Sequence, residues 1–397
     1  MESRESSLRV ETVTDIRELA RLKDAWSRLC EDMGGDVSVF ASVEWYECWW
    51  RHFSAGATLN VIALWQADRL VGVAPLMVRR ATIHGLPVTA VSFIENRQSL
   101  HNDFLVLPAV REQFLREMVR CLLREPARWD VVVFRNLSEN SASRCTLAGI
   151  LAETGRTWRQ SPTWYDSPYL KPAGSWEEYL AGRSTRTRKS LRHIRNGFAR
   201  AGYDVSVRNI RTWEEFLAVR DEVLAVAKQS WAEQSGDSLA SPANEAFIND
   251  LAFSAAQKGW LSLWTLALNG RMIAIEFHLR AFGREHALRG HYLPEFAALS
   301  PGTYLESEIL RQIFGESPTV QVYDFCGSFE SYKRKWTDSF VPHCDLTLFG
   351  KRSRGRCLAF HEIIVVPLLK RMFPKDFWNC RLFGLLGIST RRMDTEG

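Results

Sequence analysis

A helix followed by a strand is encoded in residues 300–325, which read SPGTYLESEILRQIFGESPTVQVYDF. Leu305, Ile309 and Ile313 recur at a spacing of four residues, which is typical of one face of a helix. This spacing predicts a helix from about residue 303 to residue 314. The apolar run that follows predicts a strand at 320–325, so this segment joins a helix N-terminus to a strand end with ionisable side chains.

The start of this helix is a candidate site for an anion. Ser300 is a residue type favoured at the N-cap, and Pro301 fits the first helical turn, where a missing N–H costs nothing. Gly302 allows a ligand to approach the backbone closely, and the free N–H groups and the helix dipole favour negative charge. We therefore interpret Ser300, Gly302 and Thr303 as candidates for cofactor binding. A plain helix start is the alternative that so short a motif leaves open.

The same order of elements occurs twice along the chain. In the second half, Asn269-Gly270 is a strong hairpin turn between strands at 261–268 and 271–280 that precede the helix. The first half repeats the order strand, turn, strand, helix, strand at 60–65, 66–68, 69–78, 111–124 and 131–134. The repetition predicts a tandem duplication of one α/β unit.

This order predicts an α/β fold of tandem units, each a mixed central β-sheet flanked by helices. Two prolines and a glycine within Pro168–Gly174 mark a boundary. We therefore expect an N-terminal scaffold unit at 1–170, a C-terminal unit with the chemistry at 171–350, and a helical tail at 351–397. Further helices of the second unit are expected at 181–201, 213–229 and 242–257.

Composition indicates a soluble, cytoplasmic protein. Eight cysteines are scattered without a C-x-x-C pair, which favours reduced thiols over disulfides or a zinc site, and no metal is expected. The charged N-terminus lacks the apolar core of a signal peptide, and the aliphatic run Ile363–Leu369 is too short to span a bilayer. Net charge is +5, yet residues 351–397 hold ten Lys/Arg and four Asp/Glu, so the basic excess belongs to the tail.

Several motifs resemble one known family. They are F-A-S-V-E-W…W-W at 40–50, G-V-A-P-L-M at 72–77, L-N-G-R-M-I-A at 268–274, S-P-G-T at 300–303 and Y-D-F-C-G-S-F-E-S-Y-K-R-K-W at 323–336. Together they resemble the CelD/BcsL-type acetyltransferases of the GNAT superfamily, which is related to the FemABX peptidyltransferases. The resemblance covers most of the chain. It implies paired GNAT-like units, an acyl-CoA donor such as acetyl-CoA, and an amine or hydroxyl acceptor, often in cell-envelope polysaccharide. The sequence departs from GNAT enzymes in one respect, because a single glycine stands where their pyrophosphate loop has several.

Acyl transfer to an amine needs a base for the amine proton and donors for the developing oxyanion. Alternation along the strand at 274–280 places Glu276, His278 and Arg280 on one face. Such a polar row is either a solvated face or the wall of a cleft. In the second interpretation Glu276 is a candidate catalytic residue and His278 a candidate for binding the acceptor.

Two further ionisable residues end predicted strands. His291 stands near the end of the next strand, where a histidine is suited to relay a proton near neutral pH. Asp324 ends the strand at 320–325, where a carboxylate would orient or deprotonate an acceptor. A surface histidine and a carboxylate that caps the following turn are the alternatives.

Tyr332 and Lys333 are catalytic candidates that the resemblance favours. It implies that Lys333 places a cation against the thioester carbonyl or an acceptor phosphate, as a matching lysine does in FemABX relatives. It implies that Tyr332 protonates the leaving thiolate, as a tyrosine does in the comparable part of many GNAT sites. A packed helix with exposed charged ends is the alternative for both.

The segment 183–200 holds seven Lys/Arg and no acid. Its unbalanced charge makes Arg188 and Arg192 candidates for binding an anionic substrate, such as coenzyme A phosphates, a nucleotide sugar or an anionic polymer. A solvated helix face is the alternative. Because the segment lacks the interleaved aromatic residues of single-strand binders, no nucleic-acid partner is expected.

The tail alternates basic clusters with the apolar runs Ile363–Leu369 and Leu382–Leu386. Such segments either dock as helices on the second unit or lie on an anionic membrane surface, and we favour docking. The sequence as a whole predicts an acyl-CoA-dependent N- or O-acyltransferase that modifies a sugar-like or amine acceptor. The alternatives are a FemABX-like transferase that depends on aminoacyl-tRNA and a non-catalytic partner in a polysaccharide-synthesis complex.

Overall fold

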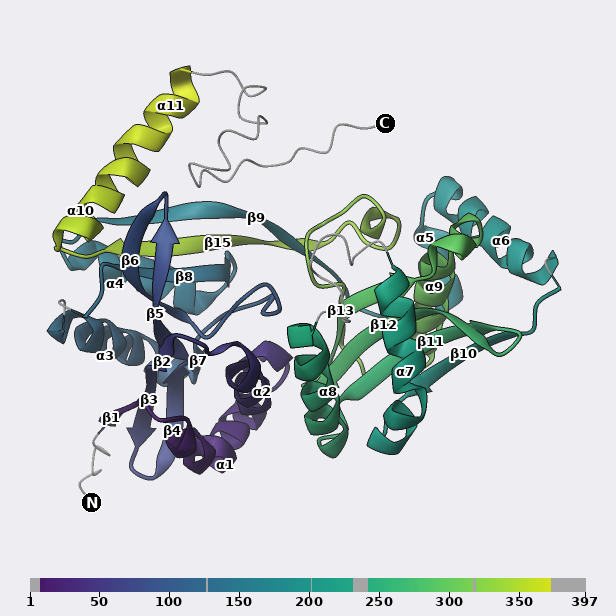
Figure 1. The fold of residues 1–397 in the computed structure, drawn as a ribbon, viewed down its shortest axis with the longest axis horizontal. Helices are drawn as coiled ribbons and strands as arrows, with labels where there is room; N and C mark the ends of the chain where they lie inside the picture. The colour runs from purple at the N-terminus through teal and green to yellow at the C-terminus, as the bar shows by residue number, and fades with distance from the viewer. Residues whose placement is uncertain (1–7, 126–127, 201, 231–241, 317–318, 373–397) are drawn as a thin grey trace. The chain divides into compact units, whose positions relative to one another are not determined.

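The computed structural model describes residues 8–125, 128–200, 202–230, 242–316 and 319–372, which form two compact units (Figure 1). Unit 1 contains the chain up to Met33, Ser54–Tyr165 and the chain from Pro342 onward. Unit 2 contains Gly34–Phe53 and Asp166–Val341. The third crossing between units, at Asp166, lies just before the expected boundary, but the units interleave along the chain and do not follow one another. A linear division at 170 and 350 therefore assigns residues 34–53, 166–170 and 342–350 to the other unit.

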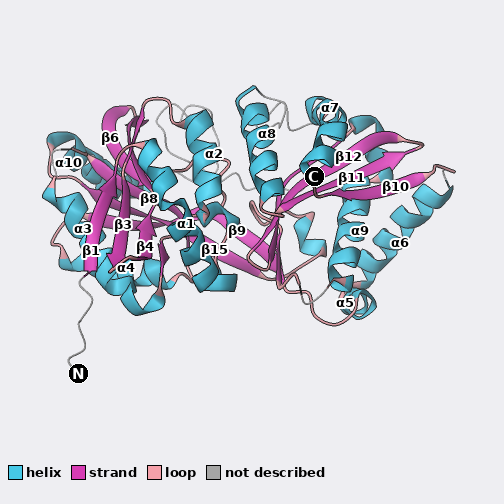
Figure 2. Ribbon diagram, turned by 90° about the horizontal axis from the view of Figure 1, so that it is seen from below, coloured by secondary structure: helices cyan, strands magenta, loops and turns pink. Residues whose placement is uncertain are grey.

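Unit 1 is built on two sheets. Its elements are β1 (Leu8–Val13), α1 (Ile16–Met33), β2 (Ala57–Leu59), β3 (Val61–Gln66), β4 (Arg69–Ala74), β5 (Leu76–Ile83), β6 (Leu86–Phe93), β7 (Leu105–Val106), α3 (Arg111–Arg124), β8 (Val131–Ser138), α4 (Ala142–Glu153), the first part of β9 (Trp158–Leu170), most of β15 (Phe340–Phe349), α10 (Ser353–Phe360), a π-helical stretch (His361–Val365) and α11 (Val366–Met372). One sheet has the order β1-β3-β4-β7, and β15-β8-β6-β5-β2 follow one another in the other. Figure 2 shows the strands of this unit between its helices.

The expected strand at 69–78 is wrong in one respect, because it is two strands, β4 and β5. Pro75 lies between them and has no N–H to give to a ladder, while its carbonyl oxygen accepts the N–H of Ile94 at 2.9 Å. The break allows β4 to pair with β3 in one sheet and β5 to pair with β6 in the other.

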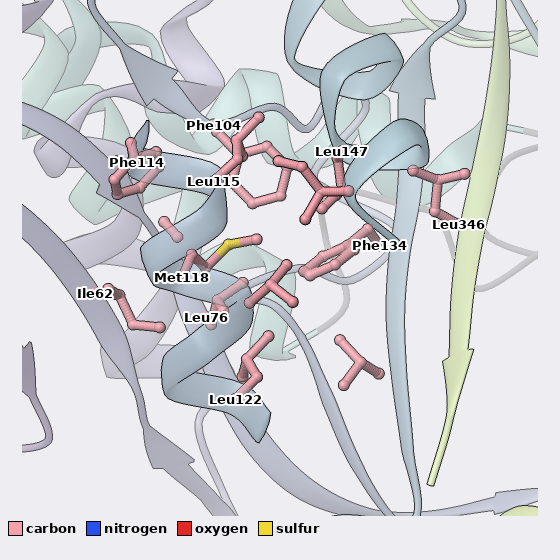
Figure 3. Packing of buried hydrophobic residues seen from close by; sticks show 14 of the residues in the cluster. Ile62, Leu76, Phe104, Phe114, Leu115, Met118, Leu122, Phe134, Leu147 and Leu346 are labelled. Carbon is pink, nitrogen blue, oxygen red and sulfur yellow. The ribbon is translucent and has the colours of Figure 1, made fainter. Parts of the chain in front are cut away.

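The apolar core of unit 1 lies between its strands and the helices α3 and α4 (Figure 3). Phe114, Leu115 and Met118 of α3 are fully buried in it, together with Phe134 of β8 and Leu346 of β15. Burial of each of these large side chains stabilises the folded unit by about 1.5–3 kcal/mol, so this core holds the unit together.

Unit 2 has one sheet with helices. Its elements are a 3₁₀ turn (Val39–Ala41), α2 (Val43–Phe53), α5 (Trp176–Gly182), α6 (Thr185–Arg200), β10 (Val205–Ile210), α7 (Trp213–Gln229), α8 (Pro242–Gln257), β11 (Leu261–Leu268), β12 (Arg271–Ala281), β13 (Arg284–Tyr292), α9 (Pro301–Gly315), β14 (Val322–Asp324) and short 3₁₀ turns at Pro294–Leu299 and Lys333–Lys335. The strand order is β10-β11-β12-β13-β14, followed by the end of β9. The predicted hairpin is confirmed, since Asn269 and Gly270 both have positive φ between β11 and β12.

Each of the two units contains a β-α-β crossover. In unit 2, β13 pairs in parallel with β14 and the connection between them contains α9. In unit 1, β6 pairs in parallel with β8 and the connection contains α3. The other strand pairs within β10-β11-β12-β13-β14 and within β15-β8-β6-β5-β2 are antiparallel, so both of these sheets are mixed, whereas the sheet β1-β3-β4-β7 is antiparallel throughout. The predicted tandem α/β fold is confirmed.

The segment 34–53 is an integral part of unit 2. Trp45 and Phe53 of α2 pack their rings against Phe247 of α8, with centroids 5.3 and 5.1 Å apart. His52 Nε2 lies 2.8 Å from a carboxylate oxygen of Asp250. The segment thus supplies core packing that residues 166–341 do not provide by themselves.

Within the described residues, no helix combines the length and apolar character needed to cross a membrane. The seven cysteines in these ranges form no disulfide. The expected tail is helical from Ser353 to Met372, and its predicted second apolar run, Leu382–Leu386, lies outside the described residues.

Candidate active site

The backbone of unit 2 opens where β13 leaves β14. The two strands pair only from Arg284–Val322 to His286–Asp324, while β13 continues to Tyr292. Over that continuation β13 stays paired with β12 on its other side. One edge of β13 beyond His286 therefore lies outside the β13–β14 ladder and offers backbone groups to an extended ligand.

Helix α9 begins close to the end of β13. A Cβ atom placed on Gly302 would lie 3.8 Å from the Tyr292 ring, which is ordinary contact. The first intrahelical bond runs from the Tyr304 N–H to the Ser300 carbonyl at 3.0 Å, so the N–H groups of Gly302 and Thr303 precede the helical ladder. These groups are suited to an anion.

The expectation that the Ser300 side chain caps this helix is wrong. Ser300 has a left-handed backbone (φ 53°, ψ 54°), and its side chain makes no capping hydrogen bond. It ends the preceding 3₁₀ turn and starts α9, and this conformation differs from the extended one that a side-chain cap requires. The backbone turn, not a serine cap, thus directs the chain into α9.

Lys335 brings a cation to the same helix end. Its Nζ donates a hydrogen bond to Thr303 Oγ1 at 2.9 Å. Burial lowers the pKa of Lys335 from its usual value. The helix N-terminus is thereby combined with an ammonium group, which strengthens the case for a phosphate site.

A buried polar network occupies one face of the sheet. The ring N–H groups of His278 donate to Glu276 at 3.0 Å and to Glu285 at 3.1 Å. Burial by itself lowers a histidine pKa, but the hydrogen bonds and charges of the two carboxylates raise the pKa of His278 to about 9. At neutral pH His278 is therefore an imidazolium that holds Glu276 in place. The predicted common face of Glu276 and His278 is confirmed, and because both are buried it is not a solvated face.

Glu285 is the centre of this network. It accepts hydrogen bonds from Ser262 at 2.6 Å and from the guanidinium of Arg280, which also pairs with Glu316. Burial raises the pKa of a carboxyl group, but His278, Arg280 and Ser262 outweigh it and lower the pKa of Glu285 to about 2. With no exposure to solvent, Glu285 positions His278 and does not reach a ligand.

A second buried carboxyl group faces the network from α9. Tyr323 of β14 donates its hydroxyl hydrogen to Glu306 at 2.6 Å. Burial, and then the charge of Glu276, raises the pKa of Glu306 to about 8, against the hydrogen bond from Tyr323. Glu306 is therefore largely protonated at neutral pH, while its interaction with Glu276 shows that the two carboxyl groups are neighbours.

Lys333 is buried and stabilises the turn after β14. Its Nζ donates to the carbonyl oxygens of Cys326 at 2.6 Å and Ser328 at 3.1 Å. Burial lowers the pKa of Lys333, which several nearby acids including Glu306 oppose. Tyr332 is different: half of it is exposed (52%), and its ring lies under the Lys333 ammonium, 5.4 Å from the centroid.

His291 lies on the opposite face of the sheet from Glu276. It is the register partner of Ile275, whereas Glu276 is opposite Gly290. A 2.8 Å hydrogen bond joins its Nδ1 to Ser230 at the end of α7. Its Nε2 is buried and has no partner among the described residues. Burial, with help from the charge of Arg289, lowers the pKa of His291 to about 4, so the ring is neutral at pH 7.

Asp324 caps the turn after β14. Its carboxylate accepts the N–H of Cys326 at 2.8 Å and the hydroxyl of Ser167 at 3.2 Å. It is opposite His286 in register, on the other face from Glu285 and Tyr323. The structure therefore does not bring Asp324 together with Glu276 and His278 on one face.

The basic helix α6 packs beside α9. Arg195 pairs with Glu308 of α9 at 3.1 Å, and the rings of Phe198 and Tyr304 stack with centroids 4.2 Å apart. Arg188 and Arg192 are exposed on α6. The two predicted substrate-binding arginines are thus on a helix that contacts the candidate anion-binding helix.

Two residues of this site were missed in the sequence. Glu306 lies four residues before the buried Leu310 and next to the apolar stripe of α9, so an acid on a buried helix face was the available signal. Lys335 belongs to the run Lys333-Arg334-Lys335, and no local pattern distinguishes which of these cations turns toward α9.

Comparisons with known proteins agree with this geometry. Residues 185–334 match the family model described as acetyltransferase (GNAT) domain. This stretch of the chain thus corresponds to a GNAT acetyltransferase domain. The matched residues include α9, the diverging pair β13–β14, Glu276, Lys333 and the basic helix α6. The expectation of a GNAT-type acyltransferase domain is confirmed. No curated protein was found to match the sequence.

Solved structures are similar over both units. The crystal structure of FemX covers 90% of this chain and 99% of its own, with a TM-score of 0.54 and 10% identity. The C-terminal domain of a protein described as a lysylphosphatidylglycerol synthetase from Agrobacterium fabrum covers 87% of this chain and 97% of its own, with a TM-score of 0.50 and 10% identity. At this level of identity the similarity establishes the fold alone.

Proposed function

We propose that this protein transfers an acyl group, acetyl in the simplest case, from coenzyme A to an amine or hydroxyl group of a sugar-like acceptor. The observation that supports this most is the separation of β13 from β14 next to the N-terminus of α9. It provides a strand edge for an extended chain with amide groups and, beside it, a helix end for phosphates. Coenzyme A has an extended arm with amide groups that matches the strand edge, and phosphates that match the helix end.

In this proposal the donor is held by backbone groups and one lysine. The N–H groups of Gly302 and Thr303 and the ammonium of Lys335 take the pyrophosphate. The edge of β13 beyond His286 takes the amide-containing arm. The thioester supplies an activated acyl carbon, and the attack of an amine or hydroxyl on it forms the new amide or ester bond.

Glu276 is the best candidate for the general base. It stands opposite Gly290, on the part of β13 that has left β14, and retains some exposure, unlike Glu285. The His278 imidazolium orients it. Glu306, protonated near neutral pH, is suited to give a proton to the leaving thiolate.

The remaining predicted residues have supporting roles or act on another face. Lys333 fixes the turn that ends β14, and its third N–H is proposed to reach the thioester oxygen. Tyr332, exposed beside it, is proposed to contact the acceptor. A neutral His291, whose Nε2 has no partner within the described ranges, is able to take up a proton, but only from a ligand on the α7 side of the sheet. Asp324 is proposed to act through the turn it caps.

The finer assignment, to the CelD/BcsL type with a role in polysaccharide synthesis, rests on the sequence motifs. A mass-spectrometric screen tests the reaction directly: full-length protein is incubated with acetyl-CoA and a panel of amino sugars, neutral sugars and simple amines. We expect an acceptor to gain 42 Da, about the mass of one acetyl group exchanged for hydrogen. Release of coenzyme A with no modified acceptor would contradict the choice of acceptor class, and transfer abolished by ribonuclease would favour the aminoacyl-tRNA alternative.

A further inference from the structure

The helical segment 353–372 of unit 1 has two unlike faces. Its inner face is anchored to the unit: Leu358 is buried, and Glu362 pairs with both His84 and Arg159. Gly355 lies so close to the backbone of Asp130 that a Cβ atom would be 2.5 Å from its carbonyl oxygen. The segment is therefore fixed in place and does not hang free.

The outer face of the same helix is apolar and exposed. Large hydrophobic side chains recur along it at helical spacing: Phe360 (61% exposed), Ile364 (44%), Leu368 (50%) and Met372 (71%). Monomeric soluble proteins rarely expose a continuous apolar row of this kind without a use for it. Figure 1 shows α11 extending away from the strands of unit 1, which leaves this face uncovered by them.

Basic residues accompany the apolar row. Residues 351–372 contain six Lys/Arg and a single acid, Glu362, which already pairs with Arg159 and His84. Arg356 is exposed one turn before Phe360, and Arg371 is exposed beside Met372. The outer face thus has hydrophobic side chains in its middle and a guanidinium at either end.

A groove of about 620 Å³ lies at the start of this helix. It is lined by Arg80 and neighbouring residues of β5, by residues of β6, and by Arg352 and Arg354. Arg352 Nε lies 3.9 Å from a carboxylate oxygen of Asp130. The N-cap Arg352 makes no side-chain cap, so the first N–H groups of α10 add to the positive potential there.

We propose that this face of unit 1 binds the surface of a membrane that contains anionic lipids. Phe360, Ile364, Leu368 and Met372 insert among the acyl chains at the interface, and the three arginines of the groove take the lipid phosphates. At about 1.5 Å per residue the 20-residue segment is about 30 Å long, and it lies in the plane of the interface and does not span the bilayer. The proposal is independent of the reaction assigned to unit 2.

Charge argues for lipid over a second copy of the chain. If two such helices packed through their apolar rows, a parallel arrangement would place Arg356 against Arg356 of the other copy. An antiparallel arrangement would place Arg356 against Arg371. Both arrangements bring like charges together with no acid on that face to balance them, whereas an anionic surface complements every one of them.

Vesicle co-sedimentation of the full-length protein tests the proposal. Vesicles of phosphatidylcholine alone and of phosphatidylcholine with phosphatidylglycerol are compared at one fixed ionic strength. We expect binding to the anionic vesicles and little to the neutral ones. Leu368→Asp should weaken binding about tenfold, since it removes an inserted side chain and adds a repelled charge. Leu217→Asp is the matched control, because Leu217 of α7 is also 50% exposed, and it should bind like the unmodified protein.

The groove is tested with Arg80→Gln and Arg354→Gln, each of which should weaken anionic binding about fivefold. Arg124→Gln, an exposed arginine of α3, is the control and should change little. Met372→Asp repeats the apolar test if Leu368→Asp does not fold. Failure of the unmodified protein to sediment with anionic vesicles overturns the proposal. The proposal is also overturned if the protein binds no vesicles but forms a dimer that Leu368→Asp dissociates. Increased binding after removal of residues 373–397 would show that these residues cover the face. That result would contradict the proposal that the face is open to the membrane in the full-length chain.

Discussion

Two carboxyl groups of unit 2, Glu276 and Glu306, are buried as neighbours but have different hydrogen-bond partners. His278 donates hydrogen bonds to Glu276 and Glu285, and these two carboxylates raise its pKa to about 9. Among the described residues Glu306 accepts instead from the Tyr323 hydroxyl, and burial next to Glu276 raises its pKa to about 8. A carboxyl group bonded to an imidazolium and a neighbour whose raised pKa favours the protonated form are candidates for a base and an acid, and transfer from a thioester requires both.

The first prediction concerns the base. Glu276→Gln should lower turnover by about 10²–10⁴-fold, because general base catalysis contributes that much, while the fold is retained. Steady-state rates with saturating acetyl-CoA measure the loss, and donor affinity should change little. Glu285→Gln is the comparison: it should instead lower the melting temperature, since Arg280 and His278 lose their shared buried partner. Unchanged turnover in Glu276→Gln would remove it from the reaction.

A second prediction follows from the raised pKa of His278. Its value of about 9 in the folded protein exceeds the 6.5 of an ordinary histidine, so its contribution to stability is complete below pH 6.5 and is lost as the pH rises through about 9. Urea unfolding of the unmodified protein and of His278→Gln should therefore show a difference in unfolding free energy that shrinks over this range. Two pH profiles that stay parallel would contradict an imidazolium at this position.

At this scale the sequence predicted which residue types share a face but not which of them meet. Alternation along β12 correctly placed Glu276 with His278. The partner carboxyl Glu306 comes from a helix 30 residues further on, and no local pattern connects the two. At Ser300 the residue type predicted the wrong interaction: serine favours a side-chain cap, but the left-handed backbone prevents one.

At the scale of elements, α9 and β13 make the site. The apolar spacing predicted α9 closely, and the Asn269-Gly270 turn predicted the hairpin that leads into β13. The opening between β13 and β14 was not predictable, because it depends on where a parallel ladder stops and not on residue type. The cation at the start of α9 was also missed, since Lys335 reaches Thr303 from a separate 3₁₀ turn.

The third prediction tests that cation. Lys335→Met should weaken acetyl-CoA binding about tenfold or more, because a charge-assisted hydrogen bond to phosphate is lost, and should leave turnover at saturation nearly unchanged. Calorimetric titration measures the dissociation constant. Lys228→Met, an exposed lysine in the last turn of α7, is the control. Equal affinity in the two variants would place the donor phosphates elsewhere.

At the scale of the whole molecule, the chain passes from unit 1 to unit 2 and back twice. Residues 34–53 leave unit 1 to pack α2 on α8, and β15 returns to pair with β8. The repeated order of elements predicted the tandem units, but an apolar helix does not encode which unit it will cover. For this reason a linear division of the sequence was the natural expectation.

The fourth prediction tests the interleaving. A fragment of residues 166–341 lacks Trp45 and Phe53, whose contacts with Phe247 should be worth about 3 kcal/mol or more in total. We expect the fragment to melt at a lower temperature than the full chain by circular dichroism. A version with residues 34–53 joined to it by a flexible linker should recover part of the loss. A fragment as stable as the full chain would show that α2 is dispensable to unit 2.

The central claim is that the start of α9 holds an acyl-CoA, and a thermal shift tests it most directly. Acetyl-CoA at about 100 times its dissociation constant should stabilise the protein by about 2.7 kcal/mol and raise its melting temperature. Gly302→Trp should abolish the shift by blocking the first turn of α9, whereas Gly315→Trp, at the far end of the same helix where nothing lies within 4 Å, should preserve it. No shift with acetyl-CoA or longer acyl-CoAs, or the same shift in both tryptophan variants, would contradict the account.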